Sequence, residues 1–246
     1  MNKVLIVTGA GRGIGAAIAL RAAGEGYAVA VNYQRDEGAA AGVVERIRAQ
    51  GGTALAVRAD VGDPAAVREM FARVREELGP LSALVNNAGI TGRIGPFMDS
   101  DPAAIEEVFR INVHGTMHCA RAAVGAFRAA GTGGVIVNVS SVAAQTGSPG
   151  EYVHYAASKA AVEAFTLGLA RELATEGIRV CGVSPGSTLT DIHAAAGEPG
   201  RPARVAPRIP MQRLATPEEI AAPVVWMLSD AASYVTGATL RASGGL

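Results

Sequence analysis

Short apolar runs alternate with longer amphipathic stretches along the whole chain. The apolar runs are rich in β-branched residues and are polar on neither face, which is typical of strands in a parallel sheet covered by helices on both sides. They occupy Lys3–Thr8, Ala28–Tyr33, Thr53–Arg58, Leu81–Asn86, Gly134–Val139 and Arg179–Val183, with a last run at Ala238–Arg241. The pattern predicts a doubly wound α/β fold of the Rossmann type, with a parallel sheet of about seven strands.

The stretches between these runs are rich in Ala, Arg and Glu, and several open with helix start signals. Asp63-Pro64 and Asp101-Pro102 each combine a capping side chain with a proline that suits the first helical turn. Thr216-Pro217-Glu218-Glu219 adds a glutamate three residues after the capping threonine, which is the capping-box pattern. We therefore expect helices to begin at these three places.

One stretch interrupts the alternation. His193–Met211 contains four prolines, two glycines and three arginines, a composition typical of a loop. No other segment would separate two cores, and 246 residues suffice for one large core. We therefore expect residues 1–246 to form a single domain with a mobile substrate lid around residues 190–212.

Composition excludes several classes of function. Hydrophobic residues make up 49% of the chain, which argues for a packed core and against disorder. Lys plus Arg and Asp plus Glu both number 22, so no overall field draws the chain to nucleic acid or to an anionic membrane. An aromatic content of 4% is too low for a base-stacking surface. The longest uncharged stretch, Ala129–Gly150, is broken by glycines, serines and Pro149, and therefore predicts a strand between loops rather than a transmembrane helix.

The N-terminus and the cysteines indicate the compartment. The apolar run within Met1–Val7 is too short for a signal peptide. Cys119 and Cys181 are too few for a disulfide framework, and neither has a partner at metal-ligand spacing. We expect a cytoplasmic protein with two reduced, buried thiols and no metal.

A glycine-rich turn, Thr8-Gly9-Ala10-Gly11-Arg12-Gly13-Ile14-Gly15, directly follows the first predicted strand. Glycines let such a turn tighten and let backbone N–H groups approach a pyrophosphate at the N-terminus of the next helix. The spacing G-x-x-x-G-x-G differs from the literal G-x-G-x-x-G fingerprint. The turn still indicates a dinucleotide site, and the residues assigned to it are Gly9, Gly11, Arg12, Gly13, Ile14 and Gly15.

A second signal is Tyr155-Ala156-Ala157-Ser158-Lys159, the only Tyr-x-x-x-Lys in the chain. Residues four apart on a helix lie about 5–6 Å apart on one face, and an ammonium group there lowers a tyrosine pKa. Acid/base work near neutrality needs a lowering of roughly three units, more than one lysine in water supplies. Ser140 and Ser141, at the end of the fifth run, offer a hydroxyl that could polarise a carbonyl.

Together these motifs resemble the short-chain dehydrogenase/reductase family of the one-domain type, over nearly the whole chain. Its Thr-Gly-x-x-x-Gly-x-Gly motif matches Gly9, Gly13 and Gly15, and its Asn-Asn-Ala-Gly motif matches Asn86-Asn87-Ala88-Gly89. The other matches follow in the family's order: Asp60-Val61, Asn112, Ser141, Tyr155, Lys159, and Pro185-Gly186 with Thr188 and Thr190.

The resemblance implies hydride transfer between a nicotinamide cofactor and a carbonyl or secondary alcohol. Tyr155 would be the acid in reduction and the base in oxidation, and Lys159 would lower its pKa and hold the nicotinamide ribose. Ser141, with Ser140 as the alternative, would hydrogen-bond the substrate oxygen, and Asn112 would hold a water that relays protons. Further cofactor contacts would come from Asp60, Val61, Asn87, Ala88, Gly89, Pro185, Gly186, Thr188 and Thr190. Tyr152 and His154 would line or support the substrate pocket.

The end of the second run bears on the choice of cofactor. An acidic side chain there binds the 2′-hydroxyl of NAD, whereas basic groups accommodate the 2′-phosphate of NADP. Tyr33 stands where NAD-preferring members have Asp, and Arg12 and Arg35 suit a phosphate. Asp36 and Glu37 follow at once and could neutralise Arg35. We expect NADP(H) to be preferred, with NAD(H) as the alternative.

Two substrate classes stay open. A 3-oxoacyl-[acyl-carrier-protein] reductase needs a basic patch for its acidic carrier, but Ala129–Gly133 and Thr175–Gly177 contain no lysine or arginine, and Glu176 has the wrong sign. Ser148–His154 resembles sugar dehydrogenases of the glucose 1-dehydrogenase kind. Arg201, Arg204 and Arg208 in the predicted lid hint at an anionic or polar substrate, the alternative being a solvated loop.

A catalytically silent NADP-binding sensor or subunit is the alternative from another class. Because Asn112, Ser141, Tyr155 and Lys159 are all present, the sequence favours an enzyme. The resemblance also implies a homotetramer. Ala221–Leu228 and the terminal Gly237–Leu246 would suit its interface, unless they only cover the sheet.

Overall fold

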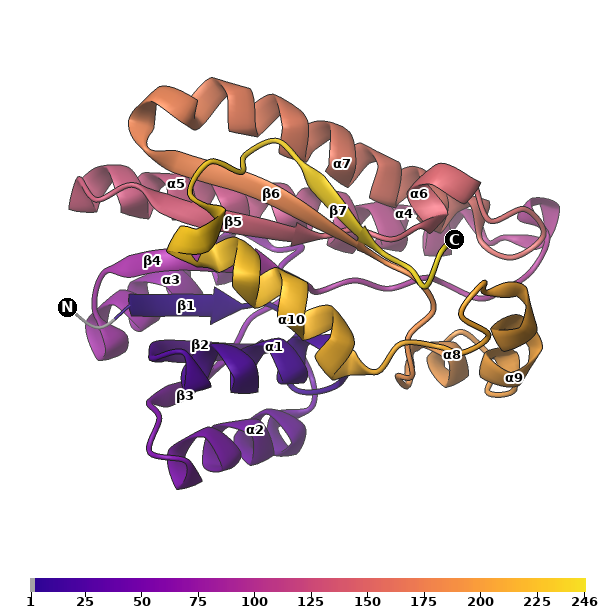
Figure 1. The fold of residues 1–246 in the computed structure, drawn as a ribbon, viewed down its shortest axis with the longest axis horizontal. Helices are drawn as coiled ribbons and strands as arrows, with labels where there is room; N and C mark the ends of the chain where they lie inside the picture. The colour runs from indigo at the N-terminus through magenta and orange to yellow at the C-terminus, as the bar shows by residue number, and fades with distance from the viewer. Residues whose placement is uncertain (1–2) are drawn as a thin grey trace.

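The computed structural model describes residues 3–246 and is built on one seven-stranded sheet with the strand order β3-β2-β1-β4-β5-β6-β7 (Figure 1). Every neighbouring pair of strands is parallel. The strands are β1 (Lys3–Val7), β2 (Tyr27–Tyr33), β3 (Ala54–Arg58), β4 (Leu81–Asn86), β5 (Gly134–Val139), β6 (Ile178–Pro185) and β7 (Thr239–Ala242). The predicted fold class is confirmed, and all seven predicted strands are present.

The helices fill the stretches between the strands. The longer ones are α1 (Gly13–Gly24), α2 (Glu37–Ala49), α3 (Pro64–Leu78), α4 (Pro102–Phe109), α5 (Thr116–Ala130), α7 (Val153–Leu173) and α10 (Pro217–Leu228). Short helices are α6 (Ala143–Thr146), α8 (Ile192–Ala195) and α9 (Arg201–Val205). The three start signals are confirmed, because Asp63, Asp101 and Thr216 each accept a bond from a first-turn N–H of the helix that follows.

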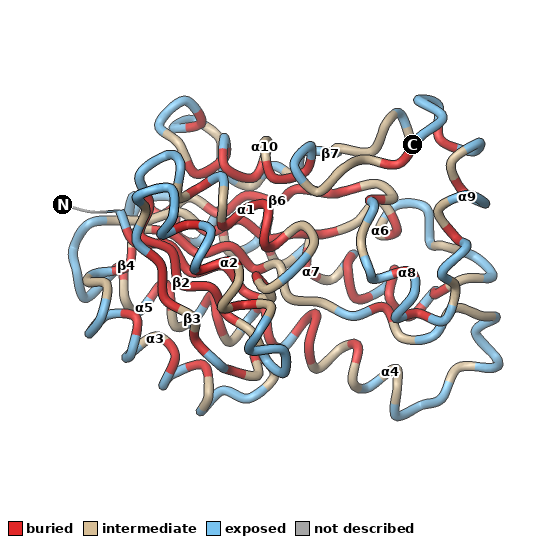
Figure 2. Tube along the Cα trace, turned by 90° about the horizontal axis from the view of Figure 1, so that it is seen from below, coloured by how far each residue is buried: buried red, intermediate tan, exposed pale blue. Residues whose placement is uncertain are grey.

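The sheet separates two apolar layers. Alternate residues of each strand face opposite sides, so that Leu5 and Val7 of β1 pack with α1, α2 and α10, whereas Val4 and Ile6 pack with α3, α5 and α7. Both faces of the strands are therefore covered, and buried segments run through the middle of the molecule (Figure 2). The unbroken apolar runs in the sequence reflect this double coverage.

A buried row of polar side chains ties α7 to the sheet. Asn86 Nδ2 donates to Asn138 Oδ1 at 2.9 Å, and Asn138 Nδ2 donates to Thr166 Oγ1 at 2.9 Å. Thr166 Oγ1 donates to Val162 O at 2.7 Å. Because buried amides left without partners are costly, this row fixes how β4, β5 and α7 align along one another.

The stretch predicted as a loop, His193–Met211, is only partly irregular. It contains the end of α8, all of α9 and a 3₁₀ turn at Ala206–Arg208, and we call Ile192–Arg208 the lid segment. Pro202 and Pro207 sit in the first turns of α9 and of the 3₁₀ turn, where a missing N–H costs nothing. The loop prediction therefore holds only in part, because these prolines start short helical turns instead of preventing them.

The apolar stretch Ala221–Leu228 lies within α10 and mainly covers the sheet. Ile220, Val224 and Leu228 are buried with α1 and the strands, whereas Trp226 is 43% exposed. Cys119 and Cys181 are both buried, free thiols. Within residues 3–246, no helix combines the length and the apolar character needed to cross a membrane. Met1 and Asn2 of the N-terminal run lie outside the described residues.

The capping box of α10 yields a stability prediction. Thr216 Oγ1 accepts from Glu219 N at 3.4 Å, and the Glu219 carboxylate accepts from Thr216 N at 2.8 Å. Replacing Thr216 by Ala should lower the free energy of unfolding by about 1 kcal/mol, because a first-turn donor loses its acceptor. Thr216→Ser, which keeps the hydroxyl, is the control and should stay near the wild type. Urea unfolding measures both, and equal stabilities of the Ala and Ser variants would contradict the assignment.

Candidate active site

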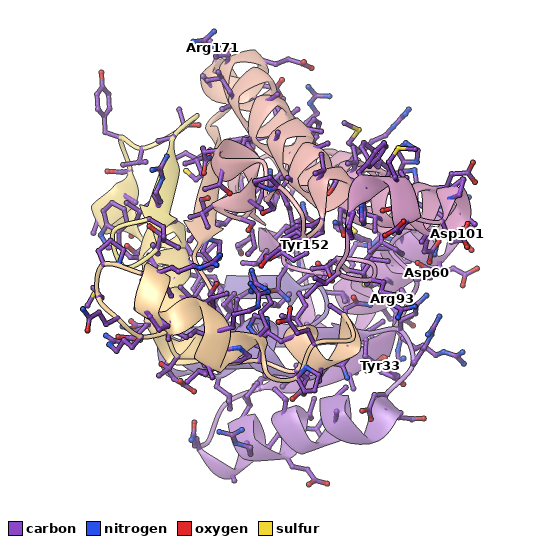
Figure 3. The ribbon with its side chains drawn as sticks, turned by 90° about the vertical axis from the view of Figure 1, so that its right-hand side faces the viewer. Tyr33, Asp60, Arg93, Asp101, Tyr152 and Arg171 are labelled. Carbon is purple, nitrogen blue, oxygen red and sulfur yellow. The ribbon has the colours of Figure 1, made fainter. Side chains whose placement is uncertain are left out.

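A cavity of about 890 Å³ opens at the carboxyl ends of the strands. It lies where the strand order reverses between β1 and β4, the place where ligands bind in open α/β sheets. Figure 3 views the molecule from this edge, with Tyr152 near the middle and Tyr33 and Asp60 farther out. Except for Asn112, every predicted site residue lines the cavity: Gly9, Gly11, Arg12, Gly13, Ile14, Gly15, Tyr33, Arg35, Asp60, Val61, Asn87, Ala88, Gly89, Ser141, Tyr155, Lys159, Pro185, Gly186, Thr188 and Thr190.

The glycine-rich turn between β1 and α1 has a shape that side chains would disturb. Gly9 and Gly13 adopt positive φ values of 61° and 54°. A Cβ on Gly15 would lie 2.4 Å from Gly9 O and 2.5 Å from Asn87 Nδ2. No side chain caps the first turn of α1 at Arg12, so its N–H groups are free for an anion. The turn fits the pyrophosphate of a dinucleotide.

Three polar side chains hold this turn in place, and one of them, Asn32, was not predicted from the sequence. Thr8 Oγ1 accepts from both Asn87 N and Ala88 N at 3.0 Å, and Asn87 Nδ2 donates to Thr8 O at 2.9 Å. Asn32 Oδ1 accepts from Gly9 N at 3.2 Å, and its Nδ2 donates to Val57 O and Ala59 O. An asparagine inside an otherwise apolar strand is the sequence signal that could have identified Asn32.

At the end of β2, Tyr33, Arg35 and Arg12 all line the cavity. Asp36 is the N-cap of α2, and its Oδ1 accepts from Ala39 N at 2.9 Å. In the part of the chain that the structure describes, neither Asp36 nor Glu37 lies within 4.0 Å of Arg35 as an ion pair. The neutralisation of Arg35 considered from the sequence is therefore not seen.

Asp60 is held rigidly beside Val61. Its Oδ1 accepts from Gly62 N at 2.8 Å, and its Oδ2 accepts from Arg110 Nη2 at 2.9 Å. Arg110 also binds Glu107 through Nε at 2.6 Å. Burial alone would raise the pKa of Asp60, but the hydrogen bonds from Arg110 and Gly62 outweigh it and lower the pKa. Asp60 is therefore a fixed carboxylate at this end of the cavity.

Asn112 lies in a π-helical turn, Arg110–Gly115, between α4 and α5. Its Oδ1 accepts from Ile90 N at 2.9 Å, and its Nδ2 donates to Ile90 O at 2.9 Å and to Ser158 Oγ at 3.0 Å. A Cβ on Gly89 would lie 3.2 Å from Asn112 Oδ1 and 3.4 Å from Lys159 Nζ. Asn112 therefore lies behind the cavity wall, joining the loop after β4 to α7.

Tyr155 and Lys159 are both buried in the first turns of α7. Lys159 Nζ donates to Val139 O at 2.8 Å and lies 5.7 Å from the centre of the Tyr155 ring. Burial lowers the pKa of Lys159 to about 8. Burial also raises the pKa of Tyr155, against the opposing effects of its hydrogen bond with Ser141 and the charge of Arg201. The protein alone thus shifts the tyrosine pKa upward, opposite to the effect expected from the lysine.

The two serines after β5 have different environments. Ser140 Oγ is buried and donates its one proton to Glu163 Oε1 at 2.8 Å, with Lys159 O at a longer 3.3 Å. Ser141 lines the cavity beside Tyr155, and its Oγ accepts from Ala143 N at 3.2 Å. Ser140 also lines the cavity, but its hydroxyl is engaged by Glu163, whereas the Ser141 hydroxyl bonds with Tyr155.

Two of the three lid arginines, which the sequence linked to an anionic or polar substrate, are paired with carboxylates. Arg201 binds Glu151 at 2.6 Å, and Arg204 binds Glu151 at 2.8 Å and Glu198 at 2.6 Å. These two cations are thereby neutralised by two carboxylates. Arg208 lines the cavity and, within residues 3–246, forms no ion pair with a carboxylate.

Tyr152 and His154 flank the start of α7. Tyr152 lines the cavity, and its ring meets that of Tyr155 edge to face at 5.2 Å between centroids. His154 Nε2 bonds with Thr91 O at 2.9 Å, behind the wall. Tyr152 is therefore a lining residue and His154 a supporting one. In the described chain, no group of three His, Cys, Asp or Glu side chains is arranged to hold a metal ion.

Comparison with known proteins gives matches over almost the whole chain. A family model described as Enoyl-(Acyl carrier protein) reductase matches residues 9–246. The chain is 49% identical to the uncharacterized oxidoreductase YgfF of Escherichia coli K12, over 98% of this chain and 99% of that protein. It is 40% identical to an L-rhamnose 1-dehydrogenase (NAD(P)(+)) of Sphingomonas sp. SKA58, over 100% and 96% of the two chains. It is 39% identical to the 3-oxoacyl-[acyl-carrier-protein] reductase FabG of Staphylococcus aureus, over 100% and 98%.

Solved structures agree with these matches. A short-chain type dehydrogenase/reductase from Mycobacterium marinum superposes with a TM-score of 0.94 at 35% identity, covering 99% of this chain and 94% of the other. A dehydrogenase/reductase from Sinorhizobium meliloti gives a TM-score of 0.91 at 37% identity, with the same coverage. The fold, the ordered motifs and these relatives lead to one conclusion: the chain belongs to the short-chain dehydrogenase/reductase family of NAD(P)-using oxidoreductases.

Proposed function

We propose that this protein is an NADP(H)-preferring oxidoreductase that interconverts a carbonyl and a secondary alcohol, with Tyr155 as the general acid and base. The observation that carries the proposal is the convergence of Ser141, Tyr155 and Lys159 in the cavity that also contains the glycine-rich turn. A catalytically silent sensor would have no use for this convergence.

When bound, the cofactor supplies the hydride in reduction and accepts it in oxidation. In reduction, Tyr155 donates the proton of its hydroxyl to the carbonyl oxygen of the substrate. Ser141 donates a hydrogen bond to the same oxygen and stabilises the negative charge that develops there. The upward shift of the Tyr155 pKa keeps the phenol protonated before reaction, which suits an acid.

Lys159 and Asn112 serve the resupply of the proton in this proposal. The buried Lys159 has a pKa near 8, so it can exchange a proton close to physiological pH. Lys159 Nζ and Asn112 Oδ1 both lie beside Gly89, at 3.4 and 3.2 Å from the position that a Cβ on this glycine would take. We propose that a water beside Asn112 relays protons between Lys159 and solvent.

The preference for NADP(H) rests on the end of β2. Tyr33 leaves this position without a carboxylate that would repel a 2′-phosphate, and Arg12 and Arg35 line the same part of the cavity. Asp36 is occupied as the cap of α2 and so leaves Arg35 available. NAD(H) remains the alternative cofactor.

For the substrate, we favour a small uncharged hydroxyl-rich molecule over a carrier-bound acyl chain. Arg128, next to the segment considered for carrier docking, binds Glu176 through two bonds of 2.7 Å and is neutralised. Arg201 and Arg204 are likewise paired. Of the three lid arginines, Arg208 alone has no carboxylate partner within residues 3–246, so an acidic carrier protein meets little free positive charge here. The similarity to an L-rhamnose dehydrogenase supports the sugar alternative.

We also propose a cytoplasmic homotetramer and a mobile lid at residues 190–212. The apolar side chains Leu167, Trp226 and Leu240 are about two-fifths exposed on α7, α10 and the edge strand β7. Exposed apolar side chains beside an unpaired strand edge suit a contact between copies. Two free thiols without a disulfide partner suit a reducing compartment.

The catalytic assignment predicts the behaviour of Tyr155→Phe. Turnover of the best substrate in a panel of ketones, β-ketoacyl thioesters and sugars should fall at least 100-fold, because the proton donor is lost. NADPH affinity should change little, since only one hydroxyl is removed. Ser141→Ala should also lower kcat, whereas Ser140→Ala should mainly lower stability by removing one of the two side-chain donors to Glu163, the other being Gln145. Wild-type kcat in Tyr155→Phe would refute the mechanism.

The glycine-rich turn predicts a cofactor-binding defect in Gly15→Ala. The new Cβ would collide with Gly9 O and Asn87 Nδ2, so NADPH affinity should fall at least tenfold in a fluorescence titration. Gly24→Ala is the matched control, because Gly24 lies in the same helix with no atom within 4 Å of the added Cβ. A titration in which both variants bind like the wild type would remove the turn from the cofactor site.

The cofactor preference predicts that NADPH binds more tightly than NADH in a direct titration. Arg35→Met should weaken NADPH binding about tenfold and leave NADH binding nearly unchanged, since only NADPH carries the 2′-phosphate. Arg58→Met is the control, because Arg58 does not itself line the cavity, although its Nε donates to Gln34 O. Tighter binding of NADH by the wild type would overturn the preference.

A further inference from the structure

One arginine of the lid segment, Arg201, is buried and lines the cavity together with Tyr152 and Tyr155. The Arg201 side chain is 9% exposed. Its Nε and Nη2 donate to Glu151 Oε2 at 3.2 and 2.6 Å, and its Nη1 lies 3.4 Å from His193 Nδ1. All three guanidinium nitrogens are thus engaged within the protein, so Arg201 is built into the site rather than left open for an anionic ligand.

The histidine behind Arg201 extends the connection to the loop after β6. Arginine can only donate, so His193 Nδ1 is the acceptor, and its Nε2 donates to Thr188 O at 2.9 Å. Burial and the charge of Arg201 lower the pKa of His193, and the backbone bond to Thr188 opposes them. His193 is therefore neutral, and Arg201 joins Glu151, before α7, to a loop predicted to cover the nicotinamide.

The guanidinium group of Arg201 lies over the first of two tyrosine rings that meet edge to face. Its guanidinium carbon is 5.3 Å from the centre of the Tyr152 ring, and the Tyr152 ring meets the Tyr155 ring nearly perpendicularly, at 85° and 5.2 Å. Lys159 approaches the Tyr155 ring at 5.7 Å. A continuous series of contacts therefore runs from the lid segment through Tyr152 to the tyrosine that we propose as the proton donor.

From this series we propose that Arg201 is a positioning residue for Tyr155. When the lid segment closes and Arg201 binds Glu151, its guanidinium group holds the Tyr152 ring, which in turn holds the ring of Tyr155 in the orientation used for proton transfer. Lid closure and alignment of the acid are then a single event. The inference rests on the proposed role of Tyr155 and adds a residue that acts on it from the lid.

The charges around Arg201, Tyr152 and Tyr155 favour this role over substrate binding. Glu151 accepts from Arg201 and Arg204, and these bonds outweigh burial and lower its pKa. The groups that face Tyr155 are Lys159 and Ser141 directly and Arg201 across Tyr152, with Glu151, Arg204 and His193 beyond Arg201. Since Arg201 and Glu151 neutralise each other, a substrate charge would have to break an existing buried pair.

The test is a double-mutant cycle on Arg201 and Tyr152. Arg201→Met and Tyr152→Leu should each lower kcat at least tenfold and change KM less than threefold, because the acid is misaligned after the substrate has bound. The double variant should lose no more than the worse single variant, since both changes interrupt one series of contacts. Arg201→Lys, which keeps a cation over the ring, should recover part of the loss.

The matched control is Arg204→Met, which removes the second cation from the same carboxylate and the same helix. Arg204 does not line the cavity, so kcat should stay within twofold of the wild type. A second readout is the pH dependence of alcohol oxidation. In Arg201→Met, the acidic limb of the pH–rate profile should move to higher pH, because the Tyr155 phenolate loses a nearby cation. In Arg204→Met, the acidic limb should stay in place.

Three results would overturn the inference. A rise in KM alone in Arg201→Met would make Arg201 a substrate-binding residue, and additive losses in the cycle would separate Arg201 from Tyr152. A crystal structure of Arg201→Met in which the Tyr155 ring has not moved would show, without any activity assay, that Arg201 does not position Tyr155. Wild-type turnover in Tyr155→Phe would instead refute the proposed function, so the two failures are distinguishable.

Discussion

The reversal of strand order between β1 and β4 is the constraint on which the site depends. The loops after these two strands turn away in opposite directions, and their backbone groups lose the neighbours that a continuous sheet would give them. Thr8 and Asn87 supply the missing partners with bonds of 2.9–3.0 Å across the gap. The opening is thus braced at its base, and the cavity above it is held open by the fold itself.

Burial then decides the protonation of the central pair. It lowers the pKa of Lys159 and raises that of Tyr155, so both groups are moved toward their neutral forms. The Tyr-x-x-x-Lys spacing predicted the proximity of the two side chains correctly, but the energetics of a buried pair differ from those of a pair on an exposed helix face. A negatively charged Tyr155 must therefore be stabilised by a bound ligand in the closed cavity rather than by the protein alone.

Much of this arrangement could be predicted from local sequence, and the rest could not. The strands were predicted from unbroken apolar runs, and three helix starts were predicted from Asp63, Asp101 and Thr216. These signals depend only on residues that are neighbours in the sequence, and all of the predicted elements are present. Arg201 and Glu151 are 50 residues apart, and nothing local marks them as a pair. For that reason the lid arginines looked like free charges, and the helices started by Pro202 and Pro207 looked like a loop.

The π-helical turn at Arg110–Gly115 contains one residue more than an α-helix would need over the same rise. Removing any one of its residues would let the segment close to regular helix, and the side chains within the turn would take new directions. Asn112 would then leave Ile90 and Ser158, although no side chain of the site had been replaced. In this segment the number of residues is constrained as strongly as their identity, so a single-codon deletion would be more damaging there than most substitutions.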